Sequence, residues 1–152
     1  SRLRYLIGDK LGIGPKNIHA YVIGEHGDSE FVPWSNATVG LQNVGKFLSA
    51  EEKQEIADEV KNAAYKIIER KGATYYGIGM CLVSITNAIL GDENRIITVS
   101  TYDKENDVFI GLPTIVNKRG AKGRVFVDLT EEESLQLQHS IDVIKEALEK
   151  IK

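Results

Sequence analysis

The sequence predicts a mixed α+β domain of ordinary size. Segments with apolar residues at helical spacing lie at both ends and in the middle of the 152-residue chain, and three short strand-like runs lie before the last of them. The expected order is helix, strand, loop, two long helices, three strands, helix. This order differs from the strict strand–helix alternation of a doubly wound nucleotide-binding fold.

The opening segment SRLRYLIGDKLG predicts a helix that ends near Gly12, because its apolar residues share one helical face: Leu3, Leu6, Ile7 and Leu11. Residues 18–23 are expected to form a strand that leads into the loop GEHGDS, residues 24–29. The segment EFVPWSNATVG should return from that loop in an extended form, and Pro33 argues against a central strand there.

Ser49 and Glu52 form the pattern of a capping box, which predicts a helix that begins at residue 50 and continues to Arg70. Lys71-Gly72 should break or kink it. The next segment, residues 73–90, is apolar nearly all round, so we expect a helix that is central in the core or forms an interface. Cys81 lies within it and is expected to be a core residue rather than a nucleophile.

The strand-like runs cover residues 96–101, 108–116 and 125–128. Short polar connections separate them, which favours an antiparallel meander. Pro113 predicts a bend or an edge position for the middle run. Thr130 opens a second capping box, and the final helix should bury one stripe, which contains Leu137, Ile141, Ile144, Leu148 and Ile151.

Composition excludes several classes of protein. Apolar residues make up 42% of the chain and the net charge is −3, without a basic block, so nucleic acid is not an expected partner. The single cysteine excludes an intrachain disulfide and suits a reducing compartment. The first residues lack the apolar core of a signal peptide, and residues 73–90 carry several polar side chains, so we expect a cytoplasmic protein without a membrane segment.

His26 is the sharpest candidate for chemistry. An imidazole can exchange protons near neutral pH, and the flanking glycines leave space for a substrate. A turn in which His26 has no chemical role remains an alternative. The motif G-x-G-x-x-G is not met by GIGPKN, so a dinucleotide would need a binding unit outside these residues. The scattered histidines show no zinc spacing, and no metal site is expected.

Several longer strings resemble one family. HAYVIGEHGDSEFVPWS is similar to the active-site segment of L-lactate dehydrogenases, and the likeness continues through SRLRYLIGDKLG, KGATYYGIGMCL and VFIGLPTIVNKRG. Residues 1–152 therefore look like the C-terminal substrate-binding and catalytic domain of a bacterial-type L-lactate dehydrogenase, with the α+β fold of the lactate/malate dehydrogenase superfamily. The resemblance implies a homo-oligomer, a dimer or tetramer, and NAD as the cofactor.

The resemblance also implies roles for particular residues. His26 would exchange a proton with the oxygen of pyruvate or L-lactate, and Arg2 would hold the substrate carboxylate. Thr74 would line the pocket for the substrate side chain, and Ile78 would pack against the nicotinamide. Arg4 and His19 match positions that bind a phosphate of fructose 1,6-bisphosphate in allosteric members. From the residues alone, solvated helix charges are the favoured interpretation of the two arginines.

Other readings remain open. The family's carbonyl-polarising arginine and dinucleotide-binding half have no counterpart in these residues, so we expect this chain alone to be inactive. Malate dehydrogenase would share the mechanism, although Glu25 favours the lactate type, and a related 2-hydroxyacid dehydrogenase is a further alternative. A non-catalytic oligomerisation domain, with the apolar helix as its interface, is an alternative from another class.

Overall fold

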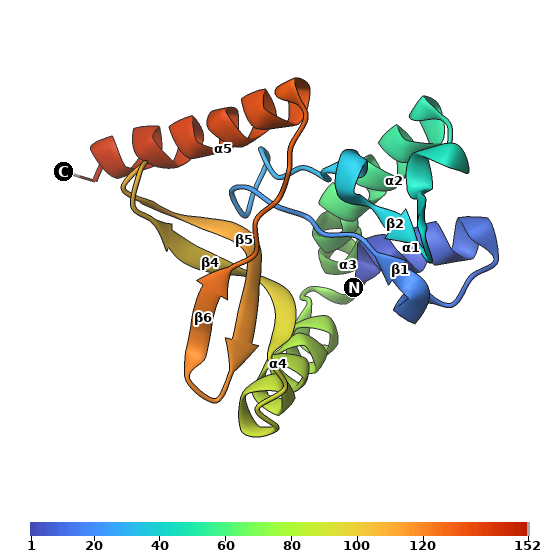
Figure 1. The fold of residues 1–152 in the computed structure, drawn as a ribbon, viewed down its shortest axis with the longest axis horizontal. Helices are drawn as coiled ribbons and strands as arrows, with labels where there is room; N and C mark the ends of the chain where they lie inside the picture. The colour runs from blue at the N-terminus through green and yellow to red at the C-terminus, as the bar shows by residue number, and fades with distance from the viewer. Residues whose placement is uncertain (152) are drawn as a thin grey trace.

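The computed structural model describes residues 1–151. The chain folds into helices and two small antiparallel sheets (Figure 1). The α-helices are α1 (Arg2–Leu11), α2 (Ala50–Lys61), α3 (Ala63–Lys71), α4 (Tyr75–Leu90) and α5 (Glu131–Glu149). The strands are β1 (Ile18–His19), β2 (Thr38–Val39), β3 (Gln42–Asn43), β4 (Arg95–Asp103), β5 (Val108–Asn117) and β6 (Gly120–Arg124). The predicted mixed α+β class is confirmed.

One core lies where α1 and α2 pack beside the small sheet β1-β2-β3, on the right of Figure 1. The predicted stripe of α1 supplies Leu3 and Ile7 to it, and Ile56 of α2 faces them. The end of α1 is also as expected, because Gly12 adopts the left-handed conformation that closes a helix (φ 66°). This core holds the short strand that leads into the GEHGDS loop.

The second core lies between the sheet β4-β5-β6 and α5. Val108 and Ile110 of β5 pack against Ile141 of α5, with Leu137 and Ile144 at its margin. The expected apolar stripe of α5 is therefore confirmed in its middle. It is wrong at its end, because Leu148 and Ile151 are exposed. Figure 1 shows α5 running across one end of this sheet.

Both predicted capping boxes are present. The Ser49 hydroxyl accepts from the Glu52 amide while the Glu52 carboxylate accepts from the Ser49 amide, and Thr130 and Glu133 repeat the arrangement at α5. The prediction of one long helix that continues to Arg70 is wrong in one respect, because the segment is divided at Asn62 into two helices, α2 and α3. The Asn62 side-chain amide donates to the Asp58 carbonyl, which gives the chain a local alternative to continuing α2.

The meander is confirmed, with β5 as its central strand, but two details differ from the expectation. The third strand is β6, residues 120–124, rather than 125–128, because the chain turns back immediately after Asn117. Pro113 lies inside the central strand, opposite Thr98 of β4, and not at an edge. The ladder with β6 covers Thr114 to Asn117, so the missing amide of Pro113 falls just outside it.

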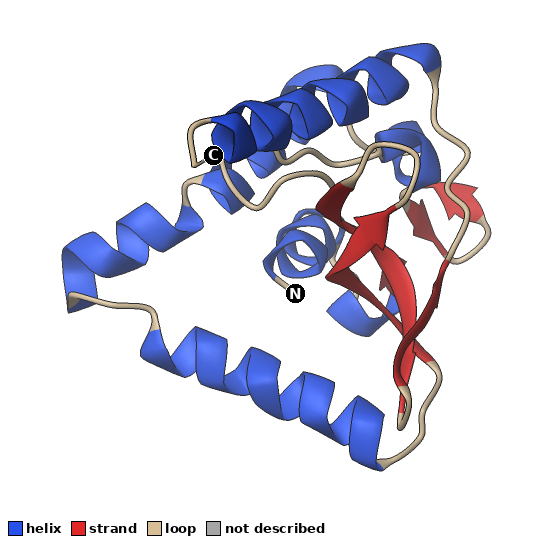
Figure 2. Ribbon diagram, turned by 90° about the vertical axis from the view of Figure 1, so that its left-hand side faces the viewer, coloured by secondary structure: helices blue, strands red, loops and turns tan. Residues whose placement is uncertain are grey.

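Helix α4 is the main departure from the expected core. It begins and ends close to the expected residues, but only Ala88 is buried, and its apolar residues lie at the surface, among them Tyr76 (84% exposed) and Met80 (68%). Cys81 is an exposed free thiol, so the expectation of a core cysteine is wrong for this chain. In Figure 2, α3 leads away from the rest of the fold and α4 runs back toward the sheet β4-β5-β6, which it contacts at β5. The alternative of an interface helix remains a prediction.

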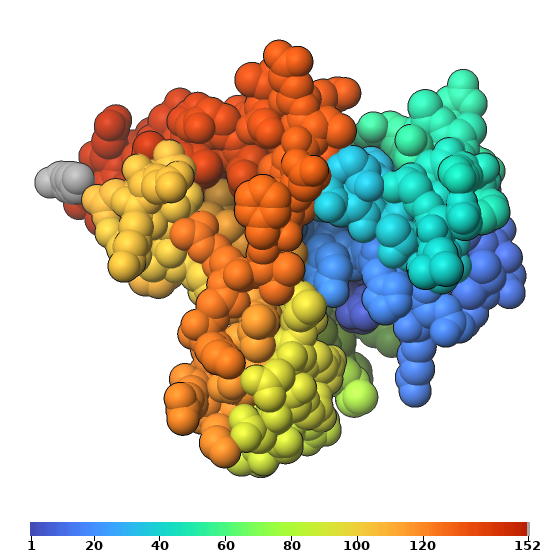
Figure 3. All heavy atoms as spheres, viewed as in Figure 1, coloured from blue at the N-terminus to red at the C-terminus, as the bar shows by residue number. Residues whose placement is uncertain are grey.

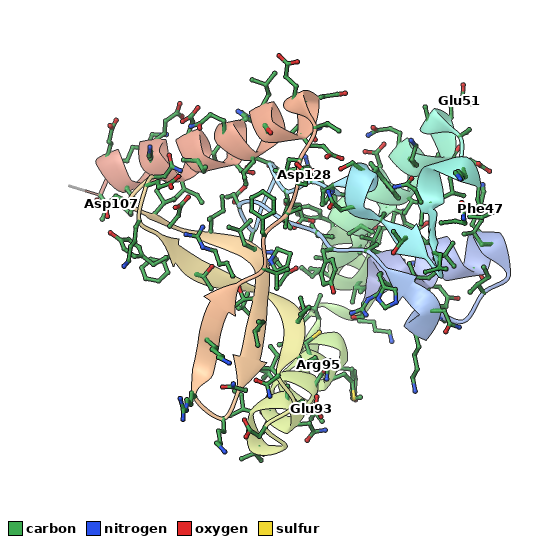
Figure 4. All side chains as sticks on the ribbon, viewed as in Figure 1. Phe47, Glu51, Glu93, Arg95, Asp107 and Asp128 are labelled. Atoms are coloured by element: carbon green, nitrogen blue, oxygen red, sulfur yellow. The ribbon has the colours of Figure 1, made fainter. Side chains whose placement is uncertain are left out.

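The connections show the polar pairing that their composition suggests. Figure 4 labels Glu93 and Arg95 at the corner between α4 and β4, where they form an ion pair of 3.5 Å. It also labels Asp107 in the turn between β4 and β5, where its carboxylate accepts from the Tyr102 hydroxyl at 2.7 Å. Between residues 1 and 151, no helix has the length and apolar content needed to cross a membrane.

Candidate active site

The GEHGDS loop begins on a very short strand. Only Ile18 and His19 of the predicted 18–23 strand form β1, and Ile23 then pairs with Phe31 in an isolated bridge. Ile23 donates to the Phe31 carbonyl at 2.9 Å and accepts from the Phe31 amide at 3.0 Å. These two residues close the base of the loop, so the chain enters and leaves it side by side.

Inside the loop, Glu25 organises the backbone. Its carboxylate accepts hydrogen bonds from the Ser29 amide at 3.2 Å and from the Ser29 hydroxyl at 2.8 Å. The Asp28 carbonyl accepts from the Lys61 ammonium of α2 at 2.6 Å. The loop is therefore tied both within itself and to a neighbouring helix.

His26 lies at the outer edge of this loop with a fully exposed side chain. Its Nδ1 lies 3.8 Å from Oε2 of Glu30, whose side chain is mostly buried. Burial raises the pKa of Glu30, and the neighbouring imidazole of His26 opposes that rise. The i, i+4 spacing of the two residues is visible in the sequence, but the sequence analysis did not identify this pair.

His26 borders a hollow of about 610 Å³ that lies against β4 and β5. Thr98, Ser100 and Gly111 line it beside apolar side chains, including Phe109 and Ile144. A second hollow of about 610 Å³ lies between α2 and the start of α5, on the other side of Glu30, and His26 does not border it. The hollow at His26 is the better candidate for chemistry, because it is bordered by a fully exposed imidazole, which can exchange protons near neutral pH.

The other predicted site residues lie elsewhere. Arg2 is on the first turn of α1, where its Nη2 contacts Oε1 of Glu59 at 2.8 Å. Thr74 immediately precedes α4 and is half-buried, and its side chain makes no capping hydrogen bond to the helix. Ile78 is 55% exposed on the first turn of α4. None of these three borders the hollow at His26.

Helices α1 and α4 nevertheless lie near each other at the start of the chain. Ser1, just before α1, lies within electrostatic range of Cys81 on α4. The space-filling view shows the surface notched between α4 and the part of the molecule that contains α1 (Figure 3).

Arg4 and His19 lie on adjacent elements, α1 and β1. Arg4 is half-buried and His19 is exposed. Within residues 1–151 neither side chain has a hydrogen-bond or ion-pair partner, so both remain able to bind an anion. Among the same residues, no cluster of histidine, cysteine, aspartate or glutamate has the geometry to hold a metal ion.

Comparison with known proteins gives a consistent result. The sequence model of the family described as lactate/malate dehydrogenase, alpha/beta C-terminal domain, matches residues 1–152. L-lactate dehydrogenase 2 of Bacillus cereus is 47% identical over 97% of this chain and 50% of the relative. L-lactate dehydrogenase 1 of Bacillus anthracis is also 47% identical, with the same coverage.

Solved structures agree with the sequence comparison. A lactate dehydrogenase from a Medee basin deep-sea metagenome library superimposes with a TM-score of 0.92 at 46% identity, covering 97% of this chain and 51% of the other. The minor L-lactate dehydrogenase of Enterococcus mundtii, in a ligand-bound form, gives a TM-score of 0.93 at 38% identity, covering 99% and 51%. The chain thus spans about half the length of the relatives that it matches.

Proposed function

The chain belongs to the lactate/malate dehydrogenase C-terminal domain family, and from that premise we propose that it is the substrate-binding and catalytic half of an NAD-dependent L-lactate dehydrogenase. The observation that carries the proposal is His26. It is held on an anchored loop with its imidazole exposed, in a chain that is 47% identical to relatives named L-lactate dehydrogenase. Pyruvate and L-lactate are the proposed substrates.

In this proposal His26 performs general acid–base catalysis. Protonated His26 donates to the carbonyl oxygen of pyruvate, and neutral His26 accepts the hydroxyl proton of L-lactate in the reverse direction. The carboxylate of Glu30 lies 3.8 Å from Nδ1 of His26. Gly27, next to His26, has no side chain, which leaves room for the Glu25 carboxylate that a Cβ there would meet.

Arg2 is proposed to hold the substrate carboxylate. A guanidinium presents five N–H groups in a planar fork, and Glu59 contacts only one of its nitrogens in this structure. The other N–H groups can bind a carboxylate while the Glu59 contact keeps the side chain extended. Thr74 is proposed to line the pocket for the methyl group of the substrate.

The exposed face at the start of α4 fits the cofactor. A nicotinamide is a flat ring, and Ile78 offers it an exposed apolar side chain without a charge nearby on the same turn. When bound, the cofactor supplies the hydride. The contribution of Ile78 is to exclude water from one side of the ring, and His26 supplies the proton.

Two further proposals concern the assembled protein. We propose a cytoplasmic homo-oligomer, since Cys81 is an exposed free thiol and α4 presents an apolar surface.

We also propose that Arg4 and His19 bind a phosphate of fructose 1,6-bisphosphate, since a guanidinium and an imidazole both suit an anion. The expected result is a lower half-saturation concentration of pyruvate when the bisphosphate is titrated into the full-length enzyme.

The deciding experiment compares substrates on the full-length enzyme. We expect kcat/KM for NADH oxidation to be at least about 100-fold higher with pyruvate than with oxaloacetate. A preference for oxaloacetate would favour malate dehydrogenase, the other activity in the family description. Activity with neither substrate would overturn the proposed reaction and leave only the fold.

A further inference from the structure

We propose that Ser140 of α5 is the positioning residue for the loop that carries His26. This inference rests on the proposed function, because it assigns Ser140 a part in the proton transfer that His26 performs. Ser140 is fully buried and lies 111 residues or more from the loop in sequence.

The hydroxyl of Ser140 contacts the loop on both sides of His26. It accepts from the Glu25 amide at 3.2 Å and donates to the Ser29 carbonyl at 2.6 Å, and the Ser29 hydroxyl lies 3.2 Å away. A serine hydroxyl has one proton to donate and two lone pairs to accept. These contacts use the proton and at least one lone pair within a single loop, so Ser140 connects the residue before His26 to the third residue after it.

The packing around Ser140 leaves little freedom. Gly24 has a φ of +103°, and a Cβ added there would lie 2.5 Å from Oγ of Ser140. On its other side Gly24 forms two backbone hydrogen bonds with Gly111 of β5, each 3.0 Å long. The start of the loop is therefore held between β5 and α5. The helix is itself fixed to the sheet by Ile141, the residue after Ser140.

His26 needs this support because it has little of its own. Its side chain is fully exposed, and its nearest charged partner, Glu30, is 3.8 Å from Nδ1. The place of the imidazole is thus set by the backbone on either side of it. A displacement of about 1 Å of a reacting group can reduce a rate about 100-fold. Loss of the Ser140 hydroxyl is expected to permit such a displacement.

The test uses the full-length enzyme with Ser140→Ala and the matched control Ser134→Ala. Ser134 lies on the same helix, but its hydroxyl donates to the Thr130 carbonyl within that helix and does not reach the loop. We expect Ser140→Ala to lower kcat about 10- to 100-fold per NADH-binding site, counted by fluorescence titration. The dissociation constant of NADH should change less than about twofold, and Ser134→Ala should leave kcat within about twofold.

A second readout does not depend on activity. Amide hydrogen exchange across residues 24–29 should be at least about tenfold faster in Ser140→Ala than in the wild type, because the Glu25 amide loses its acceptor. In addition, Gly24→Ala should lower kcat less in the Ser140→Ala background than in the wild type. The reason is that Ser140→Ala removes Oγ, the atom nearest to a Cβ at position 24.

The outcomes separate this inference from the proposed function. A wild-type enzyme that reduces neither pyruvate nor oxaloacetate would overturn the reaction, whereas faster exchange in Ser140→Ala would still support the anchoring of the loop. Unchanged exchange would overturn the anchoring. A lower melting temperature with an unchanged kcat per NADH-binding site would mean that Ser140 only stabilises the fold, and would overturn its role in positioning.

Discussion

At the scale of single residues, His26 illustrates how a fixed backbone can present a free side chain. The loop is bound at Ile23 by Phe31, within itself by Glu25, and at Asp28 by Lys61, whereas the imidazole is fully exposed. An active-site acid–base group needs this combination, because its backbone must be placed accurately while its ring remains accessible.

This placement leads to a prediction for His26→Asn in the full-length enzyme. We expect kcat to fall about 10²- to 10⁴-fold, the usual contribution of a general acid–base group, while NADH binding is retained. His139→Asn is the matched control, because His139 is an exposed histidine of α5 outside the hollow. Steady-state kinetics and NADH titration measure both effects. Equal rates for the two variants would remove His26 from the mechanism.

At the scale of elements, the N-terminus of α5 is hydrogen-bonded to the segment around Ser35 and Asn36, which follows the His26 loop. Glu133 completes the capping box with Thr130, and its carboxylate also accepts from the amide of Ser35 at 2.9 Å and from the Ser35 hydroxyl. The Asn36 side-chain amide donates a further hydrogen bond to the carbonyl of Asp128, which lies just before α5 and is labelled in Figure 4. One glutamate thus caps a helix and connects it to the segment that follows the His26 loop.

The charge of Glu133 makes this connection dependent on pH. Burial alone would raise the pKa of Glu133, but the hydrogen bonds from Ser35 and Thr130 together lower it below its usual value of 4.5. A lowered pKa in the folded state gives stability that is present above the unfolded-state pKa. That stability is lost as the pH falls through the folded-state pKa.

We therefore expect Glu133→Gln to destabilise the full-length protein by about 1–3 kcal/mol at neutral pH. The difference from the wild type should shrink as the pH falls below about 4.5 and through the lowered folded-state pKa of Glu133. Thermal unfolding at several pH values measures it. The neighbouring Glu132→Gln serves as the control, because Glu132 is exposed. A loss of the same size at every pH would mean that the charge of Glu133 is not the cause.

At the scale of the whole molecule, the chain exposes more surface than its size requires. Its accessible surface is 10230 Å², whereas a folded monomer of 16.9 kDa has about 7,700 Å². Much of the exposed apolar surface lies on α4, which runs back toward the sheet β4-β5-β6 in Figure 2. Exposed apolar patches of this extent are typical of interfaces. The face of α4 is expected to be covered in the assembled full-length enzyme.

Met80→Glu tests this expectation on the full-length enzyme. Met80 is 68% exposed on α4, and a charge placed in a covered apolar interface is costly. We expect a smaller assembly by light scattering or sedimentation, and a lower kcat. Leu41→Glu is the control, because Leu41 is 99% exposed in the turn between β2 and β3. An unchanged assembly in Met80→Glu would exclude α4 from the interface.

The 152-residue chain alone is expected to show no turnover of NADH with pyruvate.

The sequence by itself determined the features that depend on neighbours along the chain. The α+β class, both capping boxes, the end of α1 at Gly12, the meander and the candidacy of His26 all rest on local spacing and residue type, which act over a few residues. A resemblance to a known family added the expected roles of Arg2, Thr74 and Ile78. Arg2 lies on α1, Ile78 lies on α4 and Thr74 immediately precedes α4, and their roles remain predictions.

Only the tertiary structure decided which apolar residues are buried and what holds the loop. Helix α4 has the composition of a core helix, yet it is exposed, because burial depends on what packs against a segment and not on its own residues. Pro113 lies in a central strand because the ladder with β6 ends beside it. Ser140 has no local signal at all, since its hydrogen-bond partners are more than 100 residues away and only folding brings α5 to the loop.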